Sequence, residues 1–255
     1  MEQKIICVKI GGRAATETEA LKTLIGDMKE LSKDYAFILV HGGGAEVTRV
    51  SRAFGIEPEF KNGIRITSRE EMDIVEMVLS GKMNKYIVRT FASCGMTAVG
   101  LCGADAGLFT GESLSEDTRT VRIQSVQRKI LDLLLGASIV PVVSSTSMDS
   151  SGDALNINAD EAALAIAAEM KADGFLFLSD IDGIMKEGTI IRELSEDRAE
   201  REIAAGTIGG GMIPKVRSSI SGLKAGIRAI VIGQYKGKGD LSRLLSGEAG
   251  TRIIL

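Results

Sequence analysis

Short apolar runs recur along the whole chain, and most are apolar at nearly every position instead of alternating with polar residues. Continuous apolar runs of this length are typical of parallel strands that are covered on both faces. We therefore expect strands within residues 5–10, 36–40, 97–102, 138–143, 175–179, 229–232 and 252–255.

Segments of helical period lie between several of these runs. One carries Leu21, Leu24, Ile25, Met28 and Leu31, and another carries Ala162, Ala163, Ile166 and Ala167. Repeated alternation of strand and helix predicts an α/β fold of three αβα layers, with helices on both faces of a central, mainly parallel open sheet.

Two stretches depart from this alternation. Residues 56–67 contain Asn62-Gly63 between strand formers, which is a strong hairpin signal, and residues 107–123 resemble a second, weaker hairpin. No internal repeat or low-complexity linker divides the chain. We expect a single domain over 1–255 with two lobes, an N-lobe of about 1–170 and a C-lobe of about 171–255.

Composition and charge restrict the function. The formal net charge is -3, and Lys and Arg are spread along the chain instead of forming a basic block. This distribution argues against nucleic-acid or membrane partners. The three cysteines match no zinc, iron–sulfur or disulfide pattern, and the first residues read as a strand and not as a signal peptide. We expect a cytoplasmic protein.

Two glycine-rich turns follow predicted strands. In "VKIGGR" (8–13), Lys9 precedes Gly11 and Gly12, and in "VHGGGAEV" (40–47) the strand leads into Gly42, Gly43 and Gly44. Ligands collect at the carboxyl ends of parallel strands, and free backbone N–H groups beside a helix N-terminus attract anions. Both turns are candidate anion sites, although a tight turn alone also explains them.

The triple-glycine turn does not fit the familiar nucleotide motifs. The third glycine of a dinucleotide fingerprint would fall at Val47, and the chain contains no G-x-x-x-x-G-K-[ST] phosphate loop. His41 is the only histidine, and no G-x-S-x-G nucleophile motif is present. A hydrolase mechanism that needs a nucleophilic serine or two imidazoles is therefore excluded, and His41 itself is better explained as a hydrogen-bonded residue at a strand end.

Three further segments carry polar residues near predicted element ends. In "GGGMIPKV" (209–216), Pro214 suits a first helical turn, where a cation such as Lys215 is disfavoured by the helix dipole unless an anion shares the site. In "NINADEAA" (156–163), Asn158 or Asp160 can serve the helix start. "LSDIDGI" (178–184) places two acids after a strand, which suits magnesium or nucleotide hydroxyls, or simply a turn.

Taken together, these segments resemble the amino acid kinase family, in order and over nearly the whole chain. The matching segments are "VKIGG", "VHGGG", "KNGIRIT" (61–67), "GKMNK" (81–85), "VGLCGADAG" (99–107), "PVVSS" (141–145), "NINADEAA", "LSDIDGI", "GGGMIPKV" and "GTRIIL" (250–255). The resemblance implies ATP-dependent phosphorylation of a carboxylate, with Mg²⁺ carried by ATP and no metal site of the protein's own. Within the family, it is strongest to the members that act on the γ-carboxylate of N-acetyl-L-glutamate in arginine synthesis. A relative acting on carrier-bound α-aminoadipate and a ligand-sensing pseudokinase are the alternatives.

The resemblance also implies roles for individual residues. Lys9 and Lys215 would contact the transferred phosphoryl group, and Asp160 would align these two lysines. Arg65 and Asn156 would bind the acceptor's carboxylate. Backbone N–H groups for the acceptor and the phosphoryl group would come from Gly11, Gly12, Gly42, Gly43 and Gly44, and the nucleotide would be held by Asp180, Ile181, Asp182, Gly183, Ile184, Met185, Thr207, Ile208 and Gly209.

The chain departs from some relatives at two places. It reaches its first strand by about residue 4, without the additional N-terminal helix that builds an arginine-inhibited hexamer in some members, so we expect a homodimer. Residues 232–239, "IGQYKGKG", also lack the "DGR" form common in relatives.

Overall fold

The computed structural model describes residues 3–61, 64–113 and 118–255, and the chain forms two compact units. Unit 1 combines the chain up to Ile38 with Ala163–Leu255, and unit 2 spans Leu39–Ala162. The N-terminal segment thus groups with the C-terminal part of the chain, a division that differs from the two lobes drawn from the sequence.

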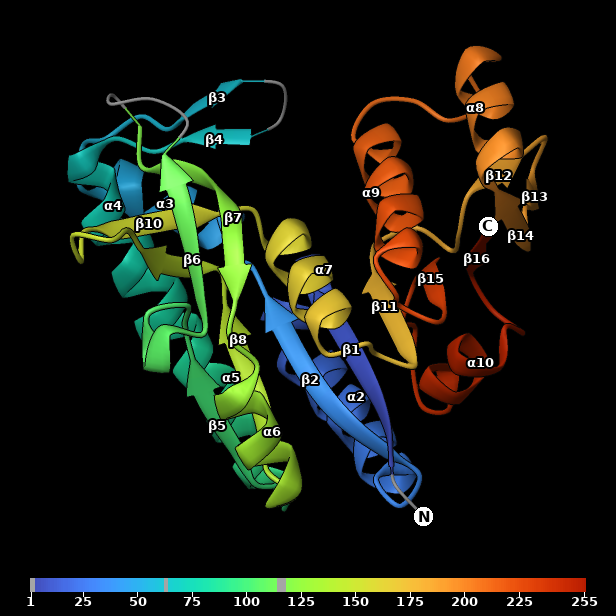
Figure 1. Ribbon diagram of the computed structural model, residues 1–255, viewed down its shortest axis with the longest axis horizontal. Helices are drawn as coiled ribbons and strands as arrows, with labels where there is room; N and C mark the ends of the chain where they lie inside the picture. The colour runs from blue at the N-terminus through green and yellow to red at the C-terminus, as the bar shows by residue number, and fades with distance from the viewer. Residues whose placement is uncertain (1–2, 62–63, 114–117) are drawn as a thin grey trace. The chain divides into compact units, whose positions relative to one another are not determined.

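Unit 1 is built on a mainly parallel sheet whose strands follow the order β14-β16-β15-β11-β1-β2 (Figure 1). β1 pairs in parallel with β11, and β11 with β15, whereas β15 and β16 are antiparallel. Every residue of β11 is buried, as its apolar sequence predicts. The strands are β1 (Lys4–Ile10), β2 (Tyr35–His41, which continues into unit 2), β11 (Gly174–Leu178), β14 (Glu193–Ser195), β15 (Ile230–Gly233) and β16 (Thr251–Ile254).

The helices of unit 1 carry apolar stripes that face its core. In α2 (Thr18–Leu31) the buried apolar residues are Leu21, Leu24, Ile25 and Met28, at the predicted helical spacing. The remaining elements are α1 (Gly12–Thr16), α7 (Ala159–Glu169, which begins in unit 2), α8 (Glu196–Ala204), α9 (Met212–Lys224), α10 (Asp240–Ser246) and the small hairpin of β12 (Met185–Lys186) with β13 (Thr189–Ile190).

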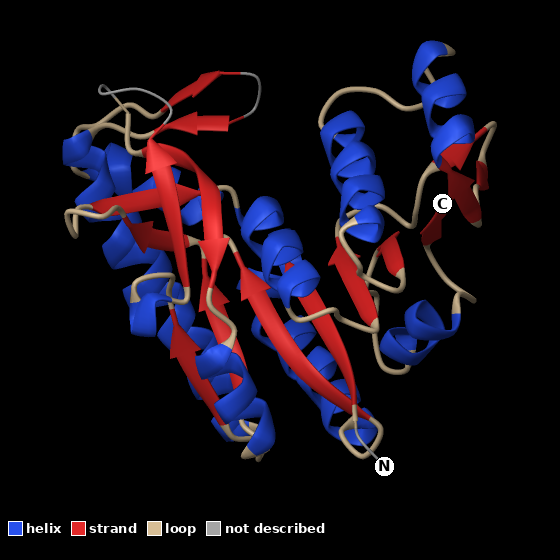
Figure 2. Ribbon diagram, in the orientation of Figure 1, coloured by secondary structure: helices blue, strands red, loops and turns tan. Residues whose placement is uncertain are grey.

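Unit 2 continues the parallel pairing from the end of β2 through β8 (Val140–Ser144) to β5 (Ala98–Leu101). A second sheet closes on itself in the order β10-β7-β6-β9. Its strands are β6 (Phe109–Ser113), β7 (Thr120–Val126), β9 (Thr146–Met148) and β10 (Ala154–Ile157). Figure 2 distinguishes these strands from the surrounding helices.

The helices of unit 2 include an unusual π-helical segment. This segment, η1 (Met77–Met83), joins α4 (Arg69–Glu76) to α5 (Asn84–Ser93), and such segments are often found near functional sites. The other helices are α3 (Gly44–Ala53), α6 (Lys129–Gly136) and the 3₁₀ turn η2 (Asp105–Gly107).

Both predicted hairpins are confirmed. β3 (Glu59–Lys61) pairs antiparallel with β4 (Ile64–Ile66), and β6 pairs antiparallel with β7. The turn residues Asn62 and Gly63 of the first hairpin lie outside the described residues. The seven predicted strands are all present, and the predicted α/β class with a mainly parallel central sheet is confirmed.

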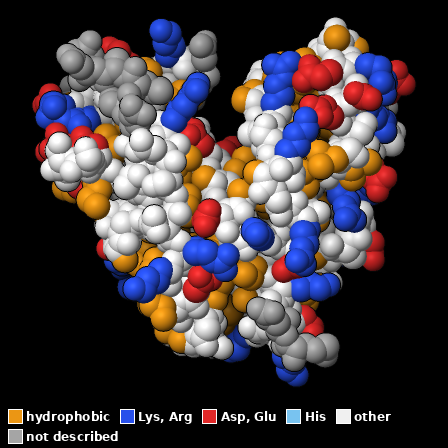
Figure 3. Space-filling model, in the orientation of Figure 1, with side chains coloured by type: hydrophobic (Ala, Val, Ile, Leu, Met, Phe, Trp, Pro, Cys, Tyr) orange, Lys and Arg blue, Asp and Glu red, His pale blue; other side chains and the backbone are white. Residues whose placement is uncertain are grey.

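The surface mixes charges of both signs. On the face drawn in Figure 3, Lys and Arg side chains are interspersed with Asp and Glu. Among the described residues, no helix has the length and apolar content needed to cross a lipid bilayer.

Candidate functional site

The triple-glycine turn joins β2 to the N-terminus of α3 in unit 2. A Cβ at Gly43 would collide with the Met83 Sδ and lie 2.9 Å from the Leu79 Cδ2, both on η1. A Cβ at Gly42 would lie 3.2 Å from the Cβ of Ala159, whereas one at Gly44 would meet nothing within 4 Å. Packing within the protein therefore explains the glycine at 43, and open space for a ligand lies at Gly44.

His41 ends β2 directly before this turn, and its side chain is fully buried. Asn84 Nδ2 lies 3.2 Å from the His41 Nε2, and the His41 Nδ1 lies 2.9 Å from the carbonyl oxygen of Gly42. Since an amide nitrogen can only donate, Nε2 accepts and Nδ1 carries the proton, which gives a neutral imidazole. His41 is thus a buried, hydrogen-bonded residue at a strand end, as its sequence context suggested.

Arg65 on β4 reaches the first turn of α3, although its side chain is only 8% exposed. Its Nη2 donates to the carbonyl oxygen of Gly44 (3.0 Å) and to Thr48 Oγ1 (2.7 Å), and its Nη1 contacts Glu71 Oε1 (2.6 Å). The Phe60 ring lies 4.8 Å from the guanidinium carbon. The guanidinium is therefore held in one orientation beside the glycine turn.

Asn156 on β10 joins the same cluster through Thr67. Its Nδ2 donates to Thr67 Oγ1 (2.9 Å), while the Thr67 backbone N–H donates to Thr120 Oγ1 (3.0 Å). Thr120 Oγ1 in turn donates to the carbonyl oxygen of Arg65. The structure thus links Gly44, Arg65 and Asn156, three of the predicted acceptor-binding residues, through a continuous set of hydrogen bonds.

The segment after Asn156 begins helix α7. Asn158 Oδ1 accepts from the backbone N–H groups of Asp160 (2.8 Å) and Glu161 (3.4 Å), so Asn158 is the N-cap. Asp160 lies in the first turn and is half-buried. Asn158, and not Asp160, therefore provides the cap of α7.

A second acid, Glu46, lies in the first turn of α3. Hydrogen bonds from Arg49 and then from Lys82 lower the pKa of Glu46 from its ordinary value of 4.5 to about 2. Glu46 therefore remains ionised at any pH at which the protein is expected to function, and it fixes Lys82 of η1 to α3.

The carboxyl ends of β1 and β11 bring several predicted residues together in unit 1. Lys9 is the register partner of Phe177, and a Cβ at Gly11 would lie 3.1 Å from the Lys9 Nζ. Gly12 has φ +51°, and a Cβ there would lie 2.7 Å from an oxygen of the Asp180 carboxylate. Lys9 and Asp180 thus approach the glycine turn closely, and Gly12 is required there by its positive φ and by the nearby carboxylate.

Lys215 lies beside the same strands. Its Nζ is 5.1 Å from the centroid of the Phe177 ring, and register partners on neighbouring strands share one face of a sheet. Lys9 and Lys215 therefore lie on the same face of unit 1. Lys215 falls in the first turn of α9, as predicted.

The predicted nucleotide segment, residues 180–185, runs from β11 into the β12–β13 hairpin. Gly183 has φ +148°, and a Cβ there would crowd Ile190 and Thr251. The apolar side chains of Ile181 and Met185 are 37% and 48% exposed, although large apolar residues are usually buried.

The second nucleotide segment, residues 207–209, lies in the loop from α8 to α9. Ile208 is buried, and its backbone N–H donates to the carbonyl oxygen of Glu202 (3.1 Å). The Glu202 carboxylate pairs with Lys186 Nζ (2.8 Å), and this hydrogen bond is the main cause of a lowered pKa at Glu202. An ion pair thus connects α8, the helix that precedes this loop, to the β12–β13 hairpin.

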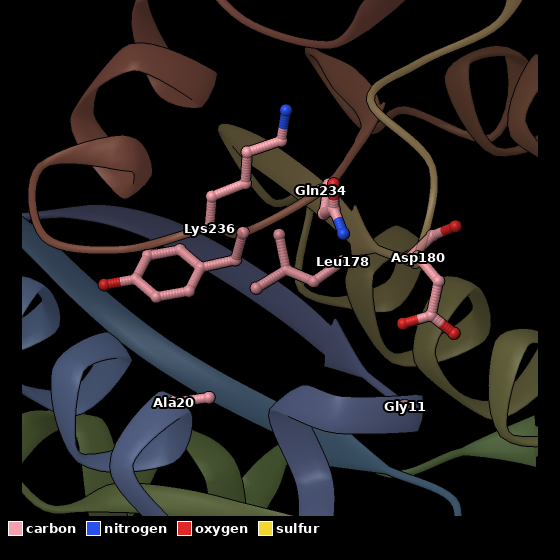
Figure 4. A pocket seen from close by; sticks show the side chains of 8 residues that line it. Gly11, Ala20, Leu178, Asp180, Gln234 and Lys236 are labelled. Atoms are coloured by element: carbon pink, nitrogen blue, oxygen red, sulfur yellow. The ribbon is translucent and has the colours of Figure 1, made fainter. Parts of the chain in front are cut away.

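A cavity of about 310 Å³ opens in unit 1 at the carboxyl ends of β1, β11 and β15 (Figure 4). Asp180 extends toward Gly11 in this view. The sequence did not single out most of the residues that line it: Ala20, Leu178, Ser179, Gln234, Tyr235 and Lys236. The last three belong to the stretch that lacks the "DGR" form, and Lys236 pairs with Asp182.

The comparisons with known proteins extend over almost the entire chain. The sequence matches the amino acid kinase family over residues 4–233. It is 38% identical to the acetylglutamate kinase of Rhizobium rhizogenes, with 99% of this chain and 92% of that protein aligned. It is 37% identical to the acetylglutamate kinase of Geobacillus kaustophilus, with 90% and 89% aligned.

Solved structures with the same fold are more distant in sequence. The structure of smu.665 from Streptococcus mutans has a TM-score of 0.83 at 23% identity and covers 98% of each chain. N-acetylglutamate synthase from Neisseria gonorrhoeae has a TM-score of 0.85 at 20% identity, over 99% of this chain and 59% of that one. Carbamate kinase from Giardia has a TM-score of 0.73 at 16% identity, over 100% and 99%. At these identities the likeness concerns the fold alone.

Proposed function

Because the chain belongs to the amino acid kinase family, we propose that it transfers the γ-phosphoryl group of ATP to the γ-carboxylate of N-acetyl-L-glutamate. The product would be the acyl phosphate N-acetyl-L-glutamyl 5-phosphate, an intermediate of arginine synthesis. The observation that carries this proposal is the 38% identity to an acetylglutamate kinase over 99% of the chain.

The chemistry of the acceptor agrees with a candidate site that contains no general base. A γ-carboxylate has a pKa near 4.3 and is already ionised at neutral pH, so the attacking oxygen needs no general base. The one histidine is buried, hydrogen-bonded and neutral, and the reaction does not require it. What the reaction requires is the alignment of two anions and stabilisation of the charge on the phosphoryl oxygens.

We assign this charge stabilisation to Lys9 and Lys215. Their shared face beside Phe177 supports the assignment. The role predicted for Asp160, which is to orient the two lysines, stays a prediction from the family resemblance. Backbone N–H groups of Gly11 and Gly12 would add donors for the phosphoryl group, because their lack of side chains leaves the backbone accessible.

We assign acceptor binding to Arg65 and Asn156, with the N-terminus of α3. The hydrogen-bonded cluster that joins them to Gly44 supports this assignment, and the N-terminal end of a helix favours a negative charge. Gly42 and Gly43 would contribute backbone N–H groups beside it. The open space at Gly44 is where the acceptor has most room to approach.

We propose that the nucleotide contacts residues 180–185 and 207–209. The exposed apolar side chains of Ile181 and Met185 are suited to contact a nucleobase, and the Lys186–Glu202 pair joins β12, which follows the first segment, to α8, which precedes the second. In this assignment the N-lobe (about 1–170) binds the acceptor and forms the dimer interface, and the C-lobe (about 171–255) binds ATP.

Mg²⁺ is expected to enter as the complex with ATP. Mg²⁺ commonly keeps several waters and binds through phosphates with one or two carboxylates, and Asp180 is the carboxylate placed to contribute. When bound, the ion neutralises charge on the phosphate oxygens. Among the described residues, no group of three or more His, Cys, Asp and Glu side chains is arranged to hold a metal.

A hydroxamate assay tests the proposed function. The purified chain is incubated with ATP, Mg²⁺ and hydroxylamine, with N-acetylglutamate in one reaction and free glutamate or aspartate in parallel reactions; phosphorylation of UMP, which forms no acyl phosphate, is followed separately by release of ADP. We expect hydroxamate only with N-acetylglutamate. Product with another acceptor and none with N-acetylglutamate would refute the proposal.

We also propose that the protein is a cytoplasmic homodimer. Light scattering on the eluting protein should give twice the 27.0 kDa mass of one chain. A mass of one chain, or of six chains, would contradict this proposal.

A further inference from the structure

Glu71 is a buried carboxylate that the proposed mechanism does not use. It lies in the first turn of α4, and its side chain is 2% exposed. Its Oε1 accepts from Arg65 Nη1 (2.6 Å) and from Ser51 Oγ (3.0 Å). Burial of a carboxylate is unfavourable unless the charge is paired and hydrogen-bonded, and Arg65 meets both needs.

The contacts of Arg65 show what this pairing does for the guanidinium. An arginine has five N–H groups, and within the described part of the chain Arg65 directs three of them to Glu71, Gly44 and Thr48. Both N–H groups of Nη2 and one of Nη1 are thus engaged, which leaves one N–H on Nη1 and one on Nε to donate to a ligand. Glu71 lies on α4 and Gly44 lies on α3, so contacts with two different helices fix the plane of the guanidinium.

We propose that Glu71 is a positioning residue, which holds the Arg65 guanidinium in the orientation that binds the α-carboxylate of the acceptor. This inference rests on the proposed function. An arginine fixed before the substrate arrives loses less conformational freedom on binding, and this preorganisation increases affinity. The contribution of Glu71 is geometry and not charge, because a second anion close to the acceptor's carboxylate would by itself weaken binding.

Two substitutions separate geometry from charge. Glu71→Gln removes the charge but keeps an oxygen that can accept from Arg65 and Ser51. Glu71→Asp keeps the charge but is one methylene shorter, so it withdraws the carboxylate from both donors. We expect Glu71→Asp to raise the KM for N-acetylglutamate about tenfold, with kcat and the KM for ATP within about threefold of wild type, since only acceptor binding is affected. Glu71→Gln should stay within about threefold of wild type in all three quantities.

The neighbouring residue provides a matched control. Glu70 lies in the same helical turn but is exposed, and Glu70→Ala removes the same charge without touching Arg65. We expect its kinetic constants to match wild type. The dissociation constant of N-acetylglutamate, measured by calorimetry without ATP, should follow the same order as the KM values for all three variants.

The outcomes distinguish this inference from the proposed function. A wild-type protein that forms no acyl phosphate from N-acetylglutamate would refute the proposed function. An active wild type whose acceptor KM is unchanged by Glu71→Asp would refute only the role of Glu71. A raised KM in Glu71→Gln with a normal value in Glu71→Asp would also refute it, since charge and not geometry would then be the property that matters.

Discussion

We predict that Asp27→Ala destabilises the protein by about 3 kcal/mol, because Asp27 is a buried cap for a helix distant in sequence. Asp27 lies on α2 and is 3% exposed. Its carboxylate accepts from the backbone N–H groups of Gly239 (2.8 Å) and Leu241 (3.3 Å), and from the Tyr235 hydroxyl (3.1 Å). Gly239 is the N-cap of α10 and has no side chain with which to cap it.

The magnitude follows from these contacts. Loss of a helix N-cap typically costs about 1 kcal/mol, and a hydrogen bond to a charged group contributes about 1.5–3 kcal/mol. Gly239 is an exposed residue whose backbone N–H can donate to water after the substitution, so the two backbone hydrogen bonds are counted together as the loss of one helix cap. The Tyr235 hydroxyl adds the charged hydrogen bond. The burial of this hydroxyl, and then the Asp27 carboxylate, raise the pKa of Tyr235, so it remains a donor.

Urea unfolding followed by circular dichroism measures this loss, because the chain contains no tryptophan to report by fluorescence. Glu30→Ala is the matched control. Glu30 lies one turn further along α2 and pairs with Lys238 of the same loop, but the pair is exposed (3.0 Å; side chains 62% and 74% exposed). We expect Glu30→Ala to change the free energy of unfolding little or not at all, because an exposed ion pair contributes little to stability. The reasoning is refuted if Asp27→Ala costs less than about 1 kcal/mol, or if Glu30→Ala costs as much as Asp27→Ala.

Three further predictions concern the candidate site. Lys215→Ala should lower kcat by about 10²–10³, whereas Arg65→Ala should mainly raise the KM of the acceptor; small and equal effects would mean that the roles are misassigned. Gly43→Ala should destabilise the protein, and this cost should be smaller in a Met83→Ala background, which lacks the sulfur that the new Cβ meets; an equal cost in both backgrounds would contradict packing as the cause. Because the folded pKa of Glu46 is lowered to about 2, its stabilising contribution is complete above about pH 5 and is lost as the pH falls toward 2. The difference in unfolding free energy between wild type and Glu46→Gln should shrink over that range, and a constant difference would disprove the contribution.

The fold could be predicted from the sequence because its strands are buried on both faces. A strand such as β11 needs apolar residues at every position, and this pattern stands out from amphipathic helices such as α2. The antiparallel pairing of β16 with β15 could not be predicted in the same way. A short buried strand has the same apolar composition whether it pairs in parallel or antiparallel. Only its connection to the neighbouring strand and its register decide which pairing forms.

The candidate site was predictable where the backbone conformation demands a particular residue, and not where a side chain merely supports another. Gly12 is an example: its positive φ favours glycine, and the nearby Asp180 carboxylate occupies the space that a Cβ would need. Glu71 is the opposite case. The pattern Ser68-x-x-Glu71 is typical of a capping box, and Ser68 does accept from the Glu71 N–H (3.1 Å). The Glu71 carboxylate instead contacts Arg65, and sequence spacing contains no signal for that choice.

Within the triple glycine, Gly43 and Gly44 lack side chains for different reasons. Gly43 lacks a side chain because Met83 and Leu79 of η1 occupy the space, which is a requirement of packing that any function would share. Gly44 has no such neighbour, yet its carbonyl oxygen is the acceptor that helps to fix Arg65. A substitution at Gly44 therefore tests ligand approach without the steric conflict expected at Gly43. If the Gly44→Ala protein folds with wild-type stability but binds the acceptor more weakly, the acceptor occupies the open space beside Gly44.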